Sequence, residues 1–327
     1  MILVRSPLRI TFGGGGTDLP SYYKKNDGFL ISAAIDKYVY VSVIKPFRKG
    51  IFLKYSDIEK VNFLHEVKHP IIRESLELIC PKNNQIEITT LADIPAGTGL
   101  GSSGSFTVAL VKALHNYKKV HVQQQTIAEI ACNIEIDRLN QPIGKQDQYA
   151  SAIGGITCFN FNKDDSVGIS PLQISEETLH NLEDNLLLFF TGYSRNANDI
   201  LEVQKKNTDA NDKKMIKNLD YVKELGYASK DSLESGDLKV FGEIMHEHWM
   251  KKKTRSDNMT NSKIDKIYTL GFNNGAIGGK LVGAGGGGFL LFLASDPKAL
   301  RIAMKNSGLD EVRFKFDFNG TQTISNT

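Results

Sequence analysis

The spacing of apolar residues predicts a chain that mixes strands with helices. Runs of β-branched or alternating apolar residues predict strands at residues 2–10, 38–44 and 86–91. Apolar positions repeat at helical spacing over residues 103–117 and 123–139, which predicts two helices. The first half of the chain is therefore expected to be of the α/β class.

The second half begins with a compact apolar run and then becomes long, charged and helical. Residues 186–190 predict a strand, and the charged stretch at residues 197–274 predicts helices. Two further strands, at residues 280–282 and 289–293, flank a run of glycines. The chain is expected to end with a helix at residues 297–307, a strand at residues 312–316 and a frayed tail at residues 319–327.

Length and composition limit the class of protein. At 327 residues the chain is long for a single core, so we expect two domains, residues 1–175 and residues 176–327. Hydrophobic residues make up 41% and charged residues 24%, which is ordinary for a folded protein. The net charge of +3 argues against a dedicated nucleic-acid binder, but it is compatible with an anionic small molecule as ligand.

The cysteines and the apolar segments indicate the compartment. Cys80, Cys132 and Cys158 have neither metal nor redox spacing, which fits free thiols in a reducing compartment. The apolar run at the N-terminus is too short for a signal peptide, and no stretch approaches a membrane span. We therefore expect a cytoplasmic protein that does not bind a membrane.

The sharpest local signal is a loop rich in glycine and serine, between a predicted strand and a predicted helix. Glycines let backbone N–H groups approach an anion, and the N-terminus of the following helix adds positive dipole character. A plain turn with a serine N-cap is the simpler alternative, but it needs far fewer of these residues. The pattern favours anion binding by Pro95, Gly97, Gly99, Leu100, Gly101, Ser102, Ser103, Gly104 and Ser105.

Two other nucleotide-binding loops can be weighed against this one. Gly99, Gly101 and Gly104 have the spacing of a dinucleotide fingerprint, but a second helix follows where that fingerprint needs a strand. A Walker A loop would close with Lys-Ser or Lys-Thr, and this loop does not. An NAD-dependent dehydrogenase is therefore the weaker hypothesis.

The loop resembles the second motif of the GHMP kinases, the family of galactokinase, homoserine kinase, mevalonate kinase and phosphomevalonate kinase. That motif has the form Pro-x-x-x-Gly-Leu-Gly-Ser-Ser, found here at residues 95–103. A first motif matches residues 6–20, and a third, glycine-rich motif matches residues 280–289. The resemblance covers nearly the whole chain. It implies an ATP-dependent kinase with a two-layer α+β fold of two domains, the second ferredoxin-like, and an active site between them.

The resemblance also implies roles for individual residues. In family members a Mg²⁺-binding glutamate follows the second serine at a similar interval, which assigns metal binding to Ser103 and Glu135. The aspartate of the Gly-x-x-Asp-Gln segment contacts the accepting hydroxyl in many relatives, and Asp147 matches it, with Arg9 as the catalytic cation beside it. From position alone, Glu135 would be a residue at the edge of a helix face and Asp147 a cap or turn residue.

The acceptor site is implied by the first and third motifs. Asp18 matches a sugar-binding acid of galactokinases, whereas Gly15 and Gly16 replace a Glu-His pair, which argues against galactose. The strings Phe-Gly-Gly-Gly-Gly-Thr-Asp-Leu-Pro, Gly-Lys-Gln-Asp-Gln-Tyr-Ala and Glu-His-Trp resemble the heptose 7-phosphate kinases of bacterial GDP-heptose synthesis. That resemblance implies phosphorylation of the anomeric hydroxyl of D-glycero-D-manno-heptose 7-phosphate to the 1,7-bisphosphate, with ATP and Mg²⁺. The implied substrate contacts are Asp18, Gly14, Gly15, Gly16, Thr17, Arg195, Gly285 and Gly286.

Several questions stay open at this point. Recognition of the substrate's own phosphate needs cations, for which Arg195 is the first candidate and residues 252–255 are the second. From position alone, the lysine run at residues 251–253 with Arg255 would be a solvated face. A kinase for an unphosphorylated sugar such as L-fucose, or a sensor that binds ATP and sugar without turnover, are the alternative functions. A homodimer is possible.

Overall fold

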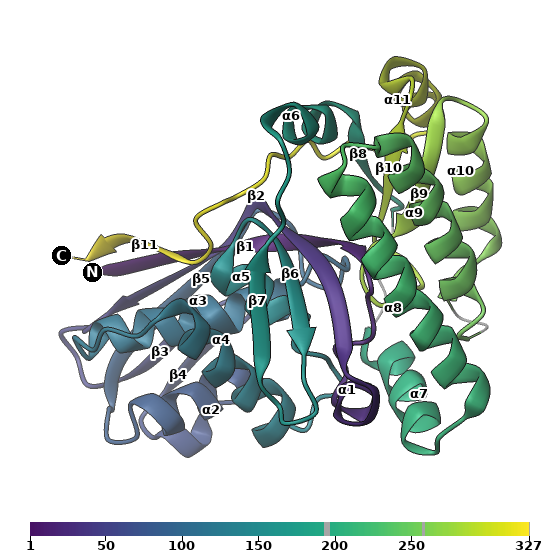
Figure 1. Ribbon diagram of the computed structural model, residues 1–327. Helices are drawn as coiled ribbons and strands as arrows, with labels where there is room; N and C mark the ends of the chain where they lie inside the picture. Colours follow the sequence, from purple (N-terminus) through teal and green to yellow (C-terminus); the bar gives the residue numbers. More distant parts are fainter. Residues whose placement is uncertain (193–196, 257–258, 327) are drawn as a thin grey trace.

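The computed structural model describes residues 1–192, 197–256 and 259–326, which form two sheets of unequal size flanked by helices (Figure 1). The strands of the larger sheet are β1 (Ile2–Gly13), β2 (Gly28–Ile44), β3 (Gly50–Lys54), β4 (Ile58–Val61), β5 (Gln85–Ala92), β6 (Ile156–Phe161), β7 (Val167–Pro171) and β11 (Gln322–Asn326). Their order is β11-β1-β2-β5-β3-β4, with β6 beside β2 and β7 beside β6. β3 and β5 are parallel, and the other neighbours are antiparallel.

β2 is the central strand of the larger sheet, and its two halves have different partners. Residues 28–33 pair with β6, whereas residues 39–44 pair with β5. The loop that follows β5 returns over β1, because the N–H of Arg9 donates to the carbonyl of Leu100 at 3.0 Å. The glycine-rich loop is thereby held against the middle of β1.

Four helices cover one face of the larger sheet: α2 (Pro70–Ile79), α3 (Ser102–Tyr117), α4 (Gln124–Cys132) and α5 (Gln146–Ile153). Apolar side chains at helical spacing, such as Val108 and Leu114 of α3, are fully buried in one cluster with Val41 and Ile88 of the sheet. Figure 1 shows these helices grouped together on the side of the sheet away from the C-terminal helices.

The smaller sheet consists of β8 (Leu186–Phe190), β10 (Phe289–Ala294) and β9 (Ala276–Leu281), in that order. It packs with α9 (Leu238–Lys253), α10 (Ser262–Phe272) and α11 (Pro297–Asn306). The preceding helices are α7 (Ala197–Asp209) and α8 (Lys213–Glu234), and two short helices, α1 (Pro20–Asn26) and α6 (Glu176–Asn185), lie between strands or beside the smaller sheet.

The two halves of the chain share a hydrophobic core. α8 contacts both α9 and the strands β1 and β2. Phe12 of β1 lies edge-on to Phe241 of α9, with ring centroids 5.4 Å apart. Both rings belong to a cluster that also contains Leu291 of the smaller sheet. This cluster sets the position of one half against the other and therefore of any site between them.

Most of the predicted elements are confirmed, although several are longer or shorter than predicted. β1, β2, β5, β8 and β10 contain the predicted strands, and α3 and α11 match the predicted helices within one residue at each end. The charged stretch that begins at residue 197 forms α7, α8, α9 and α10. The helix predicted for residues 123–139 is α4 followed by a π-helical turn, Asn133–Arg138.

Two predictions at the C-terminus are wrong. Residues 312–316 form no strand and make only an isolated bridge, between Phe316 and Ile35. The segment expected to fray instead forms β11, which pairs antiparallel with β1, so the two termini lie side by side at one edge of the larger sheet (Figure 1). The open backbone edge of β1 supplies the hydrogen bonds, and no local pattern in the tail reveals it. The division into domains at residue 175 stays a prediction.

Within the described ranges, no helix has both the length and the apolar character that crossing a membrane requires.

Candidate active site

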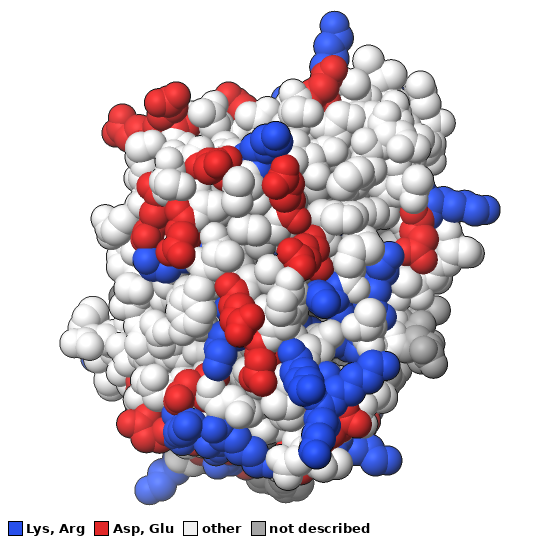
Figure 2. All heavy atoms as spheres, turned by 45° about the vertical axis from the view of Figure 1, so that its right-hand side comes forward, with Lys and Arg blue, Asp and Glu red and all other residues white. Residues whose placement is uncertain are grey.

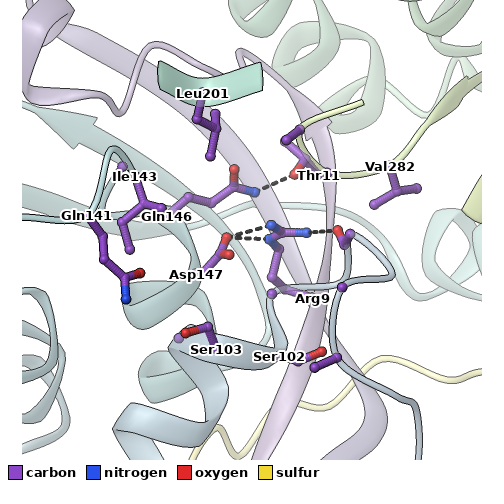
Figure 3. Close-up of a pocket in the computed structure, with 18 of the residues that line it drawn as sticks. Arg9, Thr11, Ser102, Ser103, Gln141, Ile143, Gln146, Asp147, Leu201 and Val282 are labelled. Atoms are coloured by element: carbon purple, nitrogen blue, oxygen red, sulfur yellow. Dashed lines mark hydrogen bonds and ion pairs between the residues drawn. The ribbon is translucent and has the colours of Figure 1, made fainter. Parts of the chain in front are cut away.

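A cavity of about 760 Å³ lies where the two halves of the chain meet. Its walls come from the glycine-rich loop after β5, from the loop after β1, from the start of α5, and from α9 and β9. Residues far apart in the sequence therefore face one space, and Figure 3 shows part of this lining.

The glycine-rich loop presents an uncapped helix N-terminus to the cavity. α3 begins at Ser102, and Gly101 precedes it in a left-handed conformation, with a φ of 80°. No side chain caps the start of this helix among the described residues. Free N–H groups at a helix start bind anions, and the macrodipole adds to this attraction. The loop can therefore hold phosphate groups.

Only part of the loop faces the cavity. Pro95, Leu100 and Ser105 lie behind the lining: the carbonyls of Pro95 and Leu100 accept hydrogen bonds from Thr98 and Arg9. The hydroxyl of Ser105 lies 2.8 Å from the carbonyl of Pro7 and 2.6 Å from the hydroxyl of Ser151. These three residues support the loop from behind. The remaining predicted residues line the cavity, namely Gly97, Gly99, Gly101, Ser102, Ser103 and Gly104.

A second glycine loop, between β9 and β10, packs directly against the first. A Cβ on Gly99 would lie 2.6 Å from the carbonyl oxygen of Val282, and a Cβ on Gly283 would lie 2.5 Å from the Cα of Gly99. Both residues also have positive φ values, 88° and 79°. Glycine is needed at both positions because any side chain would push the two loops apart.

The second loop meets the cavity through Gly283 and Ala284. Gly285 and Gly286, which the resemblance implied as substrate contacts, are not among the described lining residues. A Cβ on Gly285 would collide with the sulfur of Met259, and the N–H of Gly286 donates to the carbonyl of Met259. The cavity therefore gives no support to substrate contacts by Gly285 and Gly286.

Arg9 and Asp147 form an ion pair at the centre of the cavity (Figure 3). Oδ1 of Asp147 accepts hydrogen bonds from Nε of Arg9 at 2.7 Å and lies 2.6 Å from Nη2. The remaining nitrogen, Nη1, donates to the carbonyl of Gly99 at 2.6 Å. The guanidinium thus ties the carboxylate to the glycine-rich loop.

The backbone of α3 makes room for this pair. Asp147 lies in the first turn of α5, and a Cβ added to Gly104 of α3 would be only 2.6 Å from the Cβ of Asp147. The side chain of Arg9 is 6% exposed, whereas that of Asp147 is 31% exposed. The carboxylate is therefore held firmly and still open to a ligand in the cavity.

Glu135 is fully buried, although its position at the edge of a helix face had suggested a partly solvated residue. It lies in the π-helical turn after α4, a rare feature that recurs at functional sites. Its carboxylate accepts hydrogen bonds from Oγ of Ser103 at 2.5 Å and from Nε2 of Gln148 at 2.7 Å. Burial raises the pKa of Glu135, and the bonds from Ser103 and Gln148 oppose this rise.

The Ser103–Glu135 pair fits a hard divalent cation. Both residues offer oxygen atoms, beside the loop that can hold phosphates. Mg²⁺ is commonly bound by one or two protein oxygens together with substrate phosphates and waters. A cation at this place would also favour the charged carboxylate, which burial alone disfavours.

Asp18 and Asp147 are the two acids among the described residues that line the cavity, whereas Glu135 lies buried behind Ser103. Asp18 is 7% exposed, and it accepts hydrogen bonds from the N–H of Gly16 at 3.2 Å and from the N–H of Gln146 at 3.1 Å. Burial raises the pKa of Asp18, and the nearby charge of Asp147 raises it further. The two aspartates therefore act on the same part of the cavity.

The remaining residues of the first motif divide into lining and support. Gly15 and Gly16 line the cavity. Gly14 and Thr17 are not among the described lining residues, and the hydroxyl oxygen of Thr17 lies 2.8 Å from the carbonyl oxygens of both Gly14 and Phe29. Gly14 and Thr17 thus hold the loop that presents Asp18.

Besides Arg9, three buried basic residues of the described ranges face the cavity; Lys252 and Arg255 belong to the second candidate group for a phosphate contact, whereas Lys280 carried no expectation from the sequence. Lys252, Arg255 and Lys280 line the cavity and are 7%, 8% and 2% exposed. The hypothesis of a solvated face at residues 251–255 is wrong for Lys252 and Arg255. The spacing of α9 contains the missing signal, because Lys252 follows the buried Met245 and His248 at intervals of seven and four residues. Arg195, the first candidate for a phosphate contact, lies outside the described residues.

The opposite end of the cavity is aromatic and was also missed. His69 lies 4.8 Å from the ring of Tyr55 and 5.4 Å from the ring of Phe106, measured between centroids. Val39 and Leu91 complete this part of the wall. Burial lowers the pKa of His69, which favours the neutral ring. A flat apolar group such as a nucleobase fits here.

Family comparisons match both halves of the chain. The GHMP kinases N terminal domain matches residues 67–155, and the GHMP kinases C terminal domain matches residues 229–306. The D-glycero-alpha-D-manno-heptose 7-phosphate kinase of Campylobacter jejuni is 30% identical over 308 residues, 91% of this chain and 90% of that protein. A bifunctional fucokinase/GDP-fucose pyrophosphorylase of Arabidopsis thaliana is 27% identical over 90% of this chain and 30% of its own length.

A solved structure shares the fold over the whole chain. The crystal structure of a D-glycero-D-manno-heptose 1-phosphate kinase from Bacteriodes thetaiotaomicron has a TM-score of 0.82, with 99% of each chain covered. Its sequence is 23% identical, so this likeness concerns the fold.

Proposed function

The chain belongs to the GHMP kinases, which use ATP as a substrate, and we propose that its acceptor is a heptose 7-phosphate. The reaction transfers the γ-phosphoryl group of ATP to the anomeric hydroxyl and yields the 1,7-bisphosphate. The relative from Campylobacter jejuni supports this acceptor, because its name carries the same sugar phosphate and the likeness covers both chains almost fully.

One observation carries the proposal. Arg9 contacts Asp147 and the carbonyl of Gly99 at the same time, so the acid of the acceptor side and the loop of the phosphate side are joined through a single guanidinium. Phosphoryl transfer depends chiefly on positioning and on charge stabilisation. An acid whose position is fixed relative to the phosphate loop supplies the positioning directly.

The binding site of ATP, the phosphoryl donor, is assigned from the residues that line the cavity. The adenine base occupies the aromatic end near Tyr55, His69 and Phe106, and the phosphates lie along the start of α3. Ser103 and Glu135 would hold Mg²⁺, which would supply charge neutralisation to the phosphates. The uncapped N–H groups of α3 bind the phosphate oxygens and orient the γ-phosphoryl group toward Asp147.

The acceptor end uses the two aspartates. Asp18 hydrogen bonds to sugar hydroxyls, and Asp147 accepts a hydrogen bond from the anomeric hydroxyl. As the hydroxyl oxygen bonds to the γ-phosphorus, the bond from that phosphorus to the bridging oxygen breaks and ADP departs. The hydroxyl proton passes to the free oxygen of Asp147, while Arg9 keeps the carboxylate in place.

The test is ATP consumption by the purified protein with a panel of acceptors. The panel contains D-glycero-D-manno-heptose 7-phosphate, the same heptose without phosphate, L-fucose and galactose. We expect the highest kcat/KM for the heptose 7-phosphate, and phosphorus NMR should place the new phosphate on C1. Preference for L-fucose would replace this proposal with an unphosphorylated-sugar kinase, a function that the fucokinase relative makes the second candidate. Binding without turnover of any acceptor would indicate a sensor.

A further inference from the structure

We propose that Lys252, Arg255 and Lys280 form the subsite for the phosphate that the acceptor already carries, an inference that rests on the proposed sugar phosphate kinase activity. These three residues are called the basic wall below. The ligand that they recognise is a dianionic phosphate ester at the end of the sugar remote from the reacting hydroxyl.

The burial of the basic wall distinguishes it from the other lysines of this half of the chain. Lys205, Lys206, Lys213, Lys214 and Lys217 of α7 and α8 are exposed. On the face shown in Figure 2, basic side chains gather on the lower part, where they are freely accessible to solvent. Such side chains keep their hydration, whereas the three residues of the basic wall have lost nearly all of theirs.

The partners of the basic wall are neutral. Nζ of Lys280 donates to the carbonyl of Phe12 at 2.8 Å, and Nη2 of Arg255 donates to the carbonyl of Gly15 at 3.2 Å. Among the described residues, no carboxylate lies within ion-pair distance of the three cations. Buried charges without a counter-ion are strongly unfavourable, so three of them in one cavity indicate an anionic ligand.

His248 gives an independent sign of a polar ligand. It lines the cavity and is 3% exposed, yet neither ring nitrogen has a hydrogen-bond partner among the described residues. Burial lowers the pKa of His248 far below its usual range, and the charges of Lys280, Arg255 and Lys252 lower it further. A neutral imidazole can still donate one hydrogen bond to a phosphate oxygen, which would satisfy a buried group that is otherwise unpaired.

The position of the basic wall favours the acceptor over ATP. Lys280 and Arg255 bond to the end of β1 and to the loop after it, on the side of Asp18. The donor phosphates already have the uncapped start of α3 and the Ser103–Glu135 pair. Lys252 bonds to the carbonyls of Leu281 and Gly283, and Gly283 touches the phosphate loop. Substitution of Arg255 or Lys280 therefore distinguishes acceptor binding from ATP binding more clearly than substitution of Lys252 does.

The experiment compares Lys280→Met and Arg255→Met with the wild type and with a matched control. The control is Lys251→Met, which removes an exposed lysine of α9, next to the buried Lys252. For each protein, kcat and KM are measured with heptose 7-phosphate, with the unphosphorylated heptose and with ATP. Loss of a charged contact to phosphate should raise KM for heptose 7-phosphate about ten- to a hundredfold. KM for ATP and kcat/KM for the unphosphorylated heptose should change by less than about threefold, and the control should behave as the wild type.

Equal losses with both sugars would overturn the assignment. A rise in KM for ATP as large as the rise for heptose 7-phosphate would also overturn it and would give the cations to the donor. Folding is checked separately by thermal unfolding without ligand. Because replacing a buried unpaired charge by an apolar side chain is often stabilising, Lys280→Met should melt at or above the wild-type temperature. A Lys280→Met protein that does not fold would leave Arg255→Met as the deciding variant.

A binding measurement separates failure of this inference from failure of the proposed function. If the wild type phosphorylates no sugar phosphate, the proposed function fails. Calorimetry with inorganic phosphate, in the presence of a non-hydrolysable ATP analogue, then tests the subsite alone. Binding that is lost in both variants but kept in Lys251→Met supports the subsite, and no binding to the wild type overturns it.

Discussion

The two walls of the cavity differ in how their charges are satisfied. Asp18 and Asp147 line the cavity, and Glu135 lies buried behind Ser103; these three acids, here called the acid wall, come from the first half of the chain, and each already has partners. Asp147 is paired with Arg9, and Glu135 accepts two side-chain hydrogen bonds. The basic wall comes from the second half and contacts only neutral groups among the described residues.

This difference indicates which wall is complete before ligands bind. The acid wall is preorganised, because its geometry is set by bonds within the protein. The basic wall is completed by the ligand, because only an anion would offset its buried charge. Burial lowers the pKa of Arg255 to about 10, and the charge of Asp18 raises it in opposition, so the two walls also influence one another. The predictions below test whether the acid wall controls rate and the basic wall controls affinity.

The largest effect is expected from Asp147→Asn. The amide keeps the shape but removes the group that accepts the hydroxyl proton, so kcat should fall by about 10² to 10⁴. KM for ATP should stay within about threefold, because the donor contacts are separate. Steady-state kinetics at saturating ATP measure both values. A kcat near that of the wild type would show that Asp147 is not the acid of the acceptor side.

A smaller effect is expected from Glu135→Gln, and it should depend on Mg²⁺. Glutamine retains the hydrogen-bonding shape but loses the charge that a divalent cation needs. The Mg²⁺ concentration for half-maximal activity should rise about ten- to a hundredfold, with a smaller loss at saturating Mg²⁺. An unchanged Mg²⁺ titration would leave Glu135 as a buried structural residue.

Ser103→Ala should shift the same titration in the same direction, but less. The hydroxyl is an uncharged ligand, and its loss also removes one hydrogen bond to Glu135. We expect a rise of roughly three- to tenfold in the Mg²⁺ requirement. Ser75→Ala is the matched control, because Ser75 is likewise a helical serine that does not line the cavity, and its hydroxyl donates to the carbonyl of Ile71 at 2.7 Å. A larger shift in the control than in Ser103→Ala would contradict the assignment.

The smallest effect concerns pH and the basic wall. Burial lowers the pKa of Lys280 to about 7, and the charges of Arg9 and Arg255 contribute. Lys252 and His248 face the same space, and burial lowers their pKa values as well. A phosphate ester binds the protonated lysine, so KM for heptose 7-phosphate should rise several-fold between about pH 7 and pH 8.5.

The sign of this effect can also be checked through the protons taken up on ligand binding. Between about pH 7 and pH 10.5 the folded protein binds fewer protons at Lys280 than the unfolded chain does, so the destabilisation caused by this buried group decreases as the pH rises. Because the phosphate ester binds the protonated lysine, binding of the sugar phosphate at pH 8 should take up protons. Calorimetry in buffers of different ionisation enthalpy detects this uptake. In Lys280→Met both the rise in KM and the proton uptake should be much reduced. Identical behaviour in that variant would remove Lys280 from the basic wall.

Much of the donor side could be predicted because its signals are local in the sequence. The glycine–serine loop, the following helix and the long apolar strands each lie within one short window, where spacing reports backbone conformation directly. The geometry of Asp147 agrees with the role that the family resemblance implied, beside Arg9. Position alone would have left Glu135 half solvated, and only the π-helical turn brings it fully inside.

The basic wall, the aromatic end of the cavity and the edges of the sheet required the tertiary structure. The last residues form β11 because the open edge of β1 lies beside them, more than 300 residues away in the sequence. The aromatic end of the cavity gathers side chains from several separate elements, none of which carries a signal of its own. A run of lysines has the same sequence whether its side chains are solvated or buried, since burial depends on which other elements pack against it. Thus the sequence by itself determined the family and the glycine–serine loop, because those rest on short-range pattern, whereas the roles of Asp147 and Glu135 came from the family resemblance and stay proposals. Which cations face the ligand was decided only by the packing of α9 and β9 against β1, because long-range contacts remove water from some charges and leave it on others.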